Sequence, residues 1–205
     1  MLPQTWNFID KILYLSEYDT IIASDIHIGS GDILNTLDRL FTVIDTIQPT
    51  TVILNGDLYY LHCAQSMTDA YHSTLRKFIK ALILKVDTVV YLEGNHELHS
   101  EVYPKIVKDL NVKTGLYHQI SDIIVTHGHS STDKTGTEYI IGHIHPKKQN
   151  TDVYHYKINT GQYKNVTILP AFSNNVDRAD IDTYTGRCPI LNEKLNDYSF
   201  KYIHS

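Results

Sequence analysis

A short apolar run that stops at a carboxylate, amide or imidazole recurs along this chain, and it constrains the fold more than any other feature. Residues 51–54 are Thr-Val-Ile-Leu, and Asn-Gly-Asp follows at 55–57. β-branched and aliphatic residues over so short a length are typical of a buried strand. Similar runs lead into four other polar stretches, at residues 24–27, 93–97, 126–129 and 142–146. Because ligands of α/β sheets bind beyond the carboxyl ends of the strands, we expect all five polar stretches to converge on one site.

The spacing of apolar residues between the first runs predicts helices. Apolar residues recur at helical spacing over residues 33–47, 67–84 and 101–110, so strand and helix alternate, which indicates parallel strands with right-handed crossovers. The remaining runs are short and separated by Gly, Asn, Asp and Pro, which favours a second, largely antiparallel sheet. These runs are Val112–Ile120, Asp122–Thr126, Glu138–Ile144, Val153–Ile158, Val166–Phe172 and Tyr198–Ile203.

The length and composition are those of an ordinary globular protein. A chain of 205 residues without a linker or low-complexity segment is expected to form one domain over residues 1–205. Residues 6–18 are amphipathic and are compatible with either a helical turn or an edge strand. The formal net charge of −5 argues against a broad basic surface for binding duplex nucleic acid.

The chain carries no sign of export or of membrane insertion. Cys63 and Cys188 form neither a CxxC pair nor a disulfide framework, which is typical of reduced thiols. Polar residues interrupt Met1–Leu15, so this stretch has no continuous signal-peptide core, and no apolar run approaches the length of a membrane span. We therefore expect a cytoplasmic protein.

The polar stretches supply oxygen and imidazole ligands and no thiolate. The candidate ligands are Asp25, His27, Asp57, Asn95, His127, His143 and His145. Such a set suits Mn²⁺, Fe²⁺ or Zn²⁺ better than a cysteine-rich structural zinc site. Seven ligands are too many for one tetrahedral ion but suffice for two ions that share a carboxylate. Paired ions about 3.5–4 Å apart clamp a phosphoryl group and activate a water for in-line attack.

Five motifs occur in order along the first three quarters of the chain, and together they resemble the motifs of the calcineurin-like metallophosphoesterases. They are Asp25-x-His27, Gly56-Asp57, Gly94-Asn95-His96-Glu97, His127-Gly128-His129 and Gly142-His143-x-His145. The Leu-Pro-Ala-Phe-Ser segment at 169–173 further resembles the "ICC-like" branch, which includes phosphoesterases found beside DNA ligases. The resemblance implies an α/β fold, a four-layer α/β/β/α sandwich of two mixed sheets flanked by helices.

The resemblance also implies a role for each motif residue. One metal ion would be bound by Asp25, His27 and His145, the other by Asn95, His127 and His143, and Asp57 would bridge the two. His96 would contact the substrate phosphate and protonate the leaving oxygen. Glu97 fits a carboxylate that orients an imidazole, and His129 fits a substrate contact. The implied cofactors are two divalent ions, manganese first, with iron, zinc, nickel and cobalt as alternatives.

These residues predict a phosphoesterase, with a phosphodiester as the preferred substrate and nucleotides or nucleic acids as its expected source. The alternatives are a phosphomonoesterase, a single-strand nuclease, and a metal-binding scaffold for protein interactions that has lost catalysis. The presence of His96 and of every expected ligand weighs against the scaffold. The chain departs from the family pattern at Tyr60, where many relatives have Asp or His, and it lacks a glycine pair expected soon after residue 173.

Overall fold

The first six strands form one mixed sheet. The computed structural model describes residues 5–31, 33–60, 69–99, 103–110, 112–146, 153–157, 165–176, 188–191 and 200–203. In spatial order the strands are β1 (Trp6–Ile9), β2 (Ile12–Leu15), β3 (Thr20–Ser24), β4 (Thr51–Asn55), β5 (Thr88–Leu92) and β6 (Lys113–Gly115). Strands β3 to β6 run parallel, β2 pairs antiparallel with β3, and β1 pairs antiparallel with β2. Residues 6–18 therefore form an edge hairpin followed by the short 3-10 helix η1 (Ser16–Tyr18).

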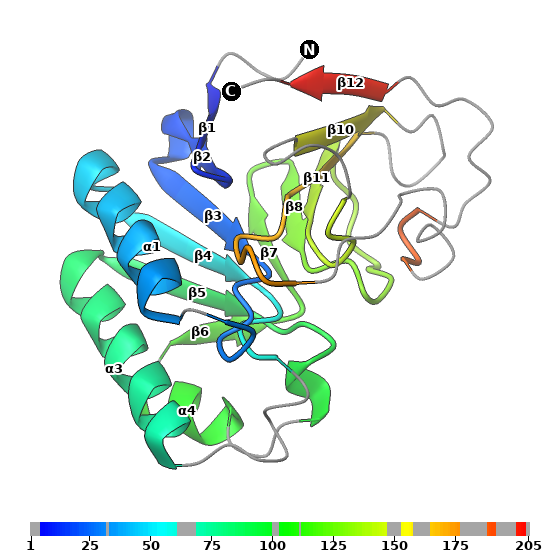
Figure 1. Cartoon of the computed structure of the whole chain (residues 1–205). Coiled ribbons are helices and arrows are strands. Elements are labelled where there is room, and N and C mark those ends of the chain that lie inside the picture. The colour runs from blue at the N-terminus through cyan, green and yellow to red at the C-terminus, as the bar shows by residue number, and fades with distance from the viewer. Residues whose placement is uncertain are drawn as a thin grey trace.

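Three described helices cover one face of this sheet (Figure 1). They are α1 (Ile33–Ile47), α3 (Asp69–Lys85) and α4 (Tyr103–Leu110), and they confirm the helices that the apolar periodicity predicts. Their buried faces pack on alternate residues of β3, β4 and β5 in one hydrophobic cluster. Within the described part of the chain, no helix has both the length and the apolar character needed to cross a bilayer.

The second sheet is also mixed. Its spatial order is β12 (Phe200–Ile203), β10 (Val153–Lys157), β11 (Asn165–Ile168), β9 (Glu138–Ile141), β8 (Ile123–Thr126) and β7 (Tyr117–Ile120). Strand β9 lies parallel to both β8 and β11, and the other pairs are antiparallel. The expected run 112–120 is divided between the sheets, because the chain leaves the first sheet after Gly115 and enters the second at Tyr117. No proline marks this break, so the pattern alone did not locate it.

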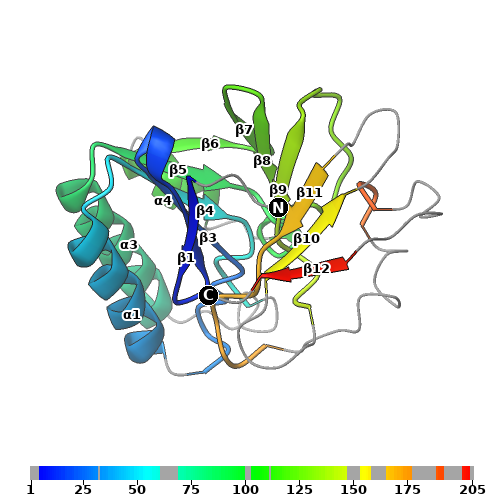
Figure 2. The same cartoon turned by 90° about the horizontal axis from the view of Figure 1, so that it is seen from above.

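The two sheets face each other, with the helices on the far side of the first sheet (Figure 2). In β4, Val52 and Leu54 pack toward the helices, whereas Ile53 packs in a cluster shared with β8 and β9 of the second sheet. Residues 188–191 contribute to a third cluster on the second sheet. Because both faces of the central strands are buried, the strands are continuously apolar. The prediction of two mixed sheets flanked by helices is confirmed.

The cluster between the sheets predicts where the fold is most sensitive to truncation. Ile53 is fully buried there, so Ile53→Ala should leave a cavity and lower the free energy of unfolding by roughly 2–5 kcal/mol. Leu84 is 87% exposed on α3, so Leu84→Ala is the matched control and should change that free energy by less than about 0.5 kcal/mol. Urea unfolding followed by circular dichroism measures both. Equal losses would contradict this assignment of the core.

Candidate metal centre

The polar stretches that follow β3, β4, β5, β8 and β9 meet at one edge of the two sheets. Within the first sheet, backbone hydrogen bonds continue beyond the strands, from Asp25 N to Gly56 O (3.2 Å) and from His27 N to Asp57 O (2.9 Å). Between the sheets, His127 Nδ1 lies 2.9 Å from the backbone oxygen of Asn55. These contacts bring together side chains that lie up to 120 positions apart in the sequence, such as Asp25 and His145.

Two groups of side chains at this edge could each hold a metal ion. The first contains Asp25, His27, Asp57 and His145, and the second contains Asp57, His127 and His143; within each group the donor atoms lie within 4.8 Å of one another. Asp57 belongs to both groups, as a bridging ligand would. His145 Nε2 lies 2.9 Å from Asp25 Oδ1 and 3.1 Å from His27 Nε2. His127 Nε2 lies 3.2 Å from Asp57 Oδ2.

The orientation of these donors fits coordination of cations. The Nδ1–H of His127 can donate to the backbone oxygen of Asn55, which turns Nε2 toward Asp57 and Asp25. A hydrogen bond at one ring nitrogen commonly prepares the other for a metal. The buried Oδ1 of Asn95 and Nδ1 of His27 have no hydrogen-bond partner among the described residues. Buried polar atoms without partners are costly, and an ion ligated by Asn95 Oδ1 would remove that cost for the amide.

The electrostatics of the cluster are dominated by burial and by two carboxylates. Burial lowers the pKa of His27 and of His143 to about 4, so both rings are neutral at pH 7. Burial also lowers the pKa of His127, but Asp57 and Asp25 outweigh burial and raise that pKa to about 10. Burial raises the pKa of Asp57, yet His127 outweighs it and brings the pKa to about 2. For Asp25, His145 and His127 likewise hold the carboxyl pKa well below its usual range against burial.

Backbone strain is concentrated at the candidate ligands. Five of them have a positive φ: Asp25 (55°), His27 (49°), Asp57 (49°), His143 (69°) and His145 (46°). The left-handed region costs an L-residue about 1–2 kcal/mol and is ordinarily left to glycine. Glycine would relieve this strain but would remove the donor side chain. The sharp turns at the strand ends are therefore formed by residues whose side chains face the site, a pattern typical of functional sites.

The glycines of the motifs provide the space for this convergence. A Cβ added at Gly94 would clash, at under 3.0 Å, with atoms of Asp57 and Glu97. A Cβ added at Gly142 would clash in the same way with Ser24 and Asp25. Each glycine thus lets a strand end approach a carboxylate more closely than any other residue would allow.

Comparison with known proteins agrees with this geometry. A family model described as calcineurin-like phosphoesterase matches residues 19–197. The chain belongs to this family. Its fold is also similar to the crystal structure of the nuclease MPE of Pseudomonas putida, with a TM-score of 0.64 over 84% of each chain and 19% sequence identity. No curated protein matches the chain. The family identifies the chain as a metal-dependent phosphoester hydrolase and its fold as that of the metallophosphoesterases.

Glu97 accepts hydrogen bonds from backbone amides at two strand ends of this phosphoesterase. Its Oε1 accepts hydrogen bonds from the backbone N–H groups of Leu58 (2.8 Å) and Tyr59 (3.2 Å), and its Oε2 from those of Asp57 (2.9 Å) and Gly94 (2.8 Å). These four hydrogen bonds run to backbone amides, and the orientation of an imidazole by Glu97 stays a prediction. One buried side chain fixes the stretch after β4 to the stretch after β5, and with them Asp57 and Asn95. The Gly-Asn-His-Glu motif contained the residue, but only the tertiary structure shows these partners.

His96 and His129 lie at the margin of the cluster. The Nε2 of His96 is 3.7 Å from Asp57 Oδ2, and 17% of the His96 side chain is exposed. Burial lowers the pKa of His96, and the negative charge of Asp57 opposes that shift. The His129 ring centroid lies 5.5 Å from that of His127 and 6.3 Å from that of His143. Both histidines thus face the site from beside the two candidate metal-binding groups.

The segment after β11 closes the side of the site near β3. Phe172 N donates to Ser24 O (2.9 Å), and Ser173 N donates to Asp25 O (3.3 Å). Ser24, which sequence reasoning did not single out, lies with its hydroxyl 2.5 Å from Asp25 Oδ2. The Leu-Pro-Ala-Phe-Ser motif therefore supports Asp25 from the second sheet through the backbone amides of Phe172 and Ser173.

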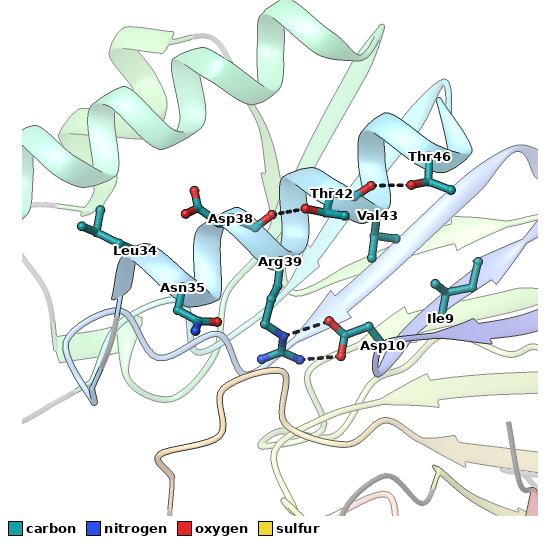
Figure 3. Close-up of a pocket in the computed structure, with 9 residues that line it drawn as sticks. All are labelled: Ile9, Asp10, Leu34, Asn35, Asp38, Arg39, Thr42, Val43 and Thr46. Carbon is teal, nitrogen blue, oxygen red and sulfur yellow. Dashed lines mark hydrogen bonds and ion pairs between the residues drawn. The ribbon is translucent and has the colours of Figure 1, made fainter.

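A groove of about 720 Å³ between α1 and the β1–β2 turn lies outside this cluster (Figure 3). Its lining consists of Ile9, Asp10, Leu34, Asn35, Asp38, Arg39, Thr42, Val43 and Thr46, none of them a candidate ligand. Arg39 donates two hydrogen bonds to Asp10, at 2.9 and 2.6 Å, and its guanidinium carbon lies 4.7 Å from the centroid of the Phe172 ring. In the turn itself, Lys11 Nζ donates to Asn174 Oδ1 at 2.6 Å. We assign Arg39, its partner Asp10, and Lys11 to supporting the 172–174 segment.

The four amides at Glu97 predict that both of its oxygens are needed as acceptors. Glu97→Gln replaces an acceptor oxygen by an amide that faces N–H donors, so the free energy of unfolding should fall by roughly 2–4 kcal/mol. Glu93→Gln is the matched control on the same stretch and should change it by less than about 0.5 kcal/mol. Chemical denaturation of the metal-stripped protein measures both, and an unaltered midpoint for Glu97→Gln would refute the role assigned to this carboxylate.

Proposed function

We propose that this phosphoesterase hydrolyses phosphodiesters at a site that holds two divalent ions. The observation that carries the proposal is the convergence of buried carboxylate and imidazole donors into two groups that share Asp57. We assign Asp25, His27 and His145 to one ion, Asn95, His127 and His143 to the other, and Asp57 to both. When bound, such ions clamp the phosphoryl group and activate a water for in-line attack.

The side chains around the ions would then orient the substrate and move one proton. His96 lies beside Asp57 and is partly exposed, so its imidazole can reach a phosphoester and protonate the leaving oxygen. A general acid of this kind contributes about 10²–10⁴-fold in rate. The backbone N–H of His96 donates to Asp57 Oδ1 at 3.1 Å, which ties the acid to the shared carboxylate. We retain His129 as a substrate contact on the side of His127 and His143.

The donor chemistry and the comparison guide the choice of metal and substrate. Carboxylate, amide and imidazole ligands suit manganese first, with iron, zinc, nickel and cobalt as alternatives. The structural neighbour is a nuclease, which supports testing diesters derived from nucleotides and short single strands.

Cys188 is a buried free thiol, in keeping with a reducing, cytoplasmic compartment.

Turnover of two nitrophenyl esters tests the proposal directly. With Mn²⁺ bound, bis-p-nitrophenyl phosphate should be hydrolysed faster than p-nitrophenyl phosphate. His96→Asn should lower turnover of an alkyl phosphodiester, whose leaving oxygen needs a proton, by about 10²–10⁴-fold and keep the metal content measured by mass spectrometry. Asp57→Asn should lose both turnover and metal.

The outcomes separate the alternatives. A preference for the monoester would replace the diesterase by a phosphomonoesterase, and cleavage of short single strands without cleavage of dinucleotides or cyclic nucleotides would favour a nuclease. If the metal-loaded protein hydrolyses no phosphoester, the result would favour the non-catalytic, protein-binding scaffold.

Metal uptake should release a proton from His127. Its pKa of about 10 means that both ring nitrogens carry protons at pH 7, and a ligand nitrogen must lose its proton to bind a cation. The metal affinity of this position should therefore rise by about tenfold per pH unit between pH 6 and 9. His27 and His143, with pKa values of about 4, add no pH dependence in that window.

Isothermal titration of Mn²⁺ in two buffers of different ionisation enthalpy measures the protons released. His127→Asn should abolish the release of protons on Mn²⁺ binding. His143→Asn should weaken Mn²⁺ binding but keep the release of protons. Uptake of metal by the unsubstituted protein with no proton released would contradict this account of the site.

A further inference from the structure

Tyr60 is held beside the candidate ligands by its backbone. Beyond the ends of β3 and β4, Ile28 N donates to Leu58 O (2.6 Å) and Tyr60 N donates to Ile28 O (3.2 Å), so the two chain segments stay paired. Glu97 binds the N–H groups of the two residues that precede Tyr60. This position is therefore fixed relative to both Asp57 and the Gly-Asn-His-Glu stretch.

The side chain of Tyr60 completes a cluster of three rings. Its ring lies nearly parallel to that of His96, with centroids 6.0 Å apart and planes at 26°. The same ring meets His27 edge-on, at 5.9 Å and 74°, and His27 meets His96 edge-on, at 4.9 Å and 82°. Offset-parallel and edge-on contacts at 4.5–7 Å are the favourable geometries for aromatic rings. The imidazole of His96 therefore packs against the faces or edges of two neighbouring rings.

We propose that Tyr60 is a positioning residue, which holds the imidazole of His96 in the orientation needed to protonate the leaving oxygen. This inference rests on the proposed function. His27 is itself a candidate ligand, so Tyr60 is the ring of the cluster to which we assign the positioning of His96. Proton transfer needs the acid within hydrogen-bond reach of the leaving oxygen as the P–O bond breaks, and a displacement of about 1 Å can cost 10²-fold in rate. An aromatic ring can limit that displacement without adding a negative charge beside the phosphate.

Leaving-group dependence distinguishes positioning of the acid from a general structural effect. An alkyl leaving group needs its proton, whereas p-nitrophenolate leaves without one. Tyr60→Ala should therefore lower kcat on an alkyl phosphodiester by about 10- to 100-fold, and on bis-p-nitrophenyl phosphate much less, with KM and metal content kept. Tyr60→Phe should restore most of the loss because it keeps the ring. Tyr60→Leu, which keeps bulk without a ring face, should behave like Tyr60→Ala and covers the case in which the alanine variant does not fold.

A double-mutant comparison gives the second readout. In a His96→Ala background, Tyr60→Ala should cause no further fall in kcat on the alkyl diester, because the acid through which it acts is gone. Tyr117→Ala, at a half-exposed tyrosine outside the ring cluster, is the matched control and should leave kcat unchanged.

Three results would overturn the inference: an equal loss on both esters, losses that multiply with those of His96→Ala, or a Tyr60→Phe variant as defective as Tyr60→Ala. The last result would assign the effect to the hydroxyl. Failure of the proposed function itself is recognised separately, because the unsubstituted, metal-loaded protein would then hydrolyse neither ester.

Discussion

The structure depends on the close approach of two buried carboxylates and several imidazoles at one edge of the sheets. Asp25 and Asp57 are almost completely buried, and His127 Nε2 lies 3.9 Å from Asp25 Oδ1 and 3.2 Å from Asp57 Oδ2. Like charges in a low-dielectric interior repel strongly unless cations or protons lie between them. In the absence of metal, His127 supplies that positive charge, since the carboxylates raise its pKa to about 10. Binding of a metal ion would replace the proton on the metal-facing nitrogen of His127 by a cation of higher charge.

Much of the surrounding fold maintains this approach against backbone strain. Positive φ values at residues such as Asp57 and His143 cost about 1–2 kcal/mol each and persist only where neighbouring structure over-determines them. Glu97 fixes the stretches after β4 and β5 in this way, because it accepts hydrogen bonds from four of their backbone amides. On the other side, Ser24 and the backbone of residues 172–173 hold Asp25. The rigid cluster between the sheets supplies the platform for both.

The outer elements of the chain act on the site through this platform. The β1–β2 turn and α1 reach the 172–174 segment through Arg39 and Lys11. Tyr60 is placed in the same way. The paired stretches after β3 and β4, which contain Asp57, also place the Tyr60 ring beside His96. The candidate ligands, His96 and the ring of Tyr60 are thus placed by one set of strand ends, which explains how a chain of 205 residues builds a multi-residue site.

The sequence by itself determined the class of fold and the candidate residues. Apolar runs such as Thr51–Leu54 specify doubly buried strands, helical periodicity specifies α1, α3 and α4, and the motif order indicated the family. These signals are local in the sequence, so they can be recognised without knowing the tertiary contacts. Only the tertiary structure decided the division of residues 112–120 between two sheets, the backbone partners of Glu97 and the stacking of Tyr60 on His96. Each of these depends on which distant segments meet. The contacts of Glu97 and Tyr60 follow from the pairing of β4 with β5 in the first sheet, and the division of residues 112–120 follows from the packing of the two sheets; no local pattern encodes either.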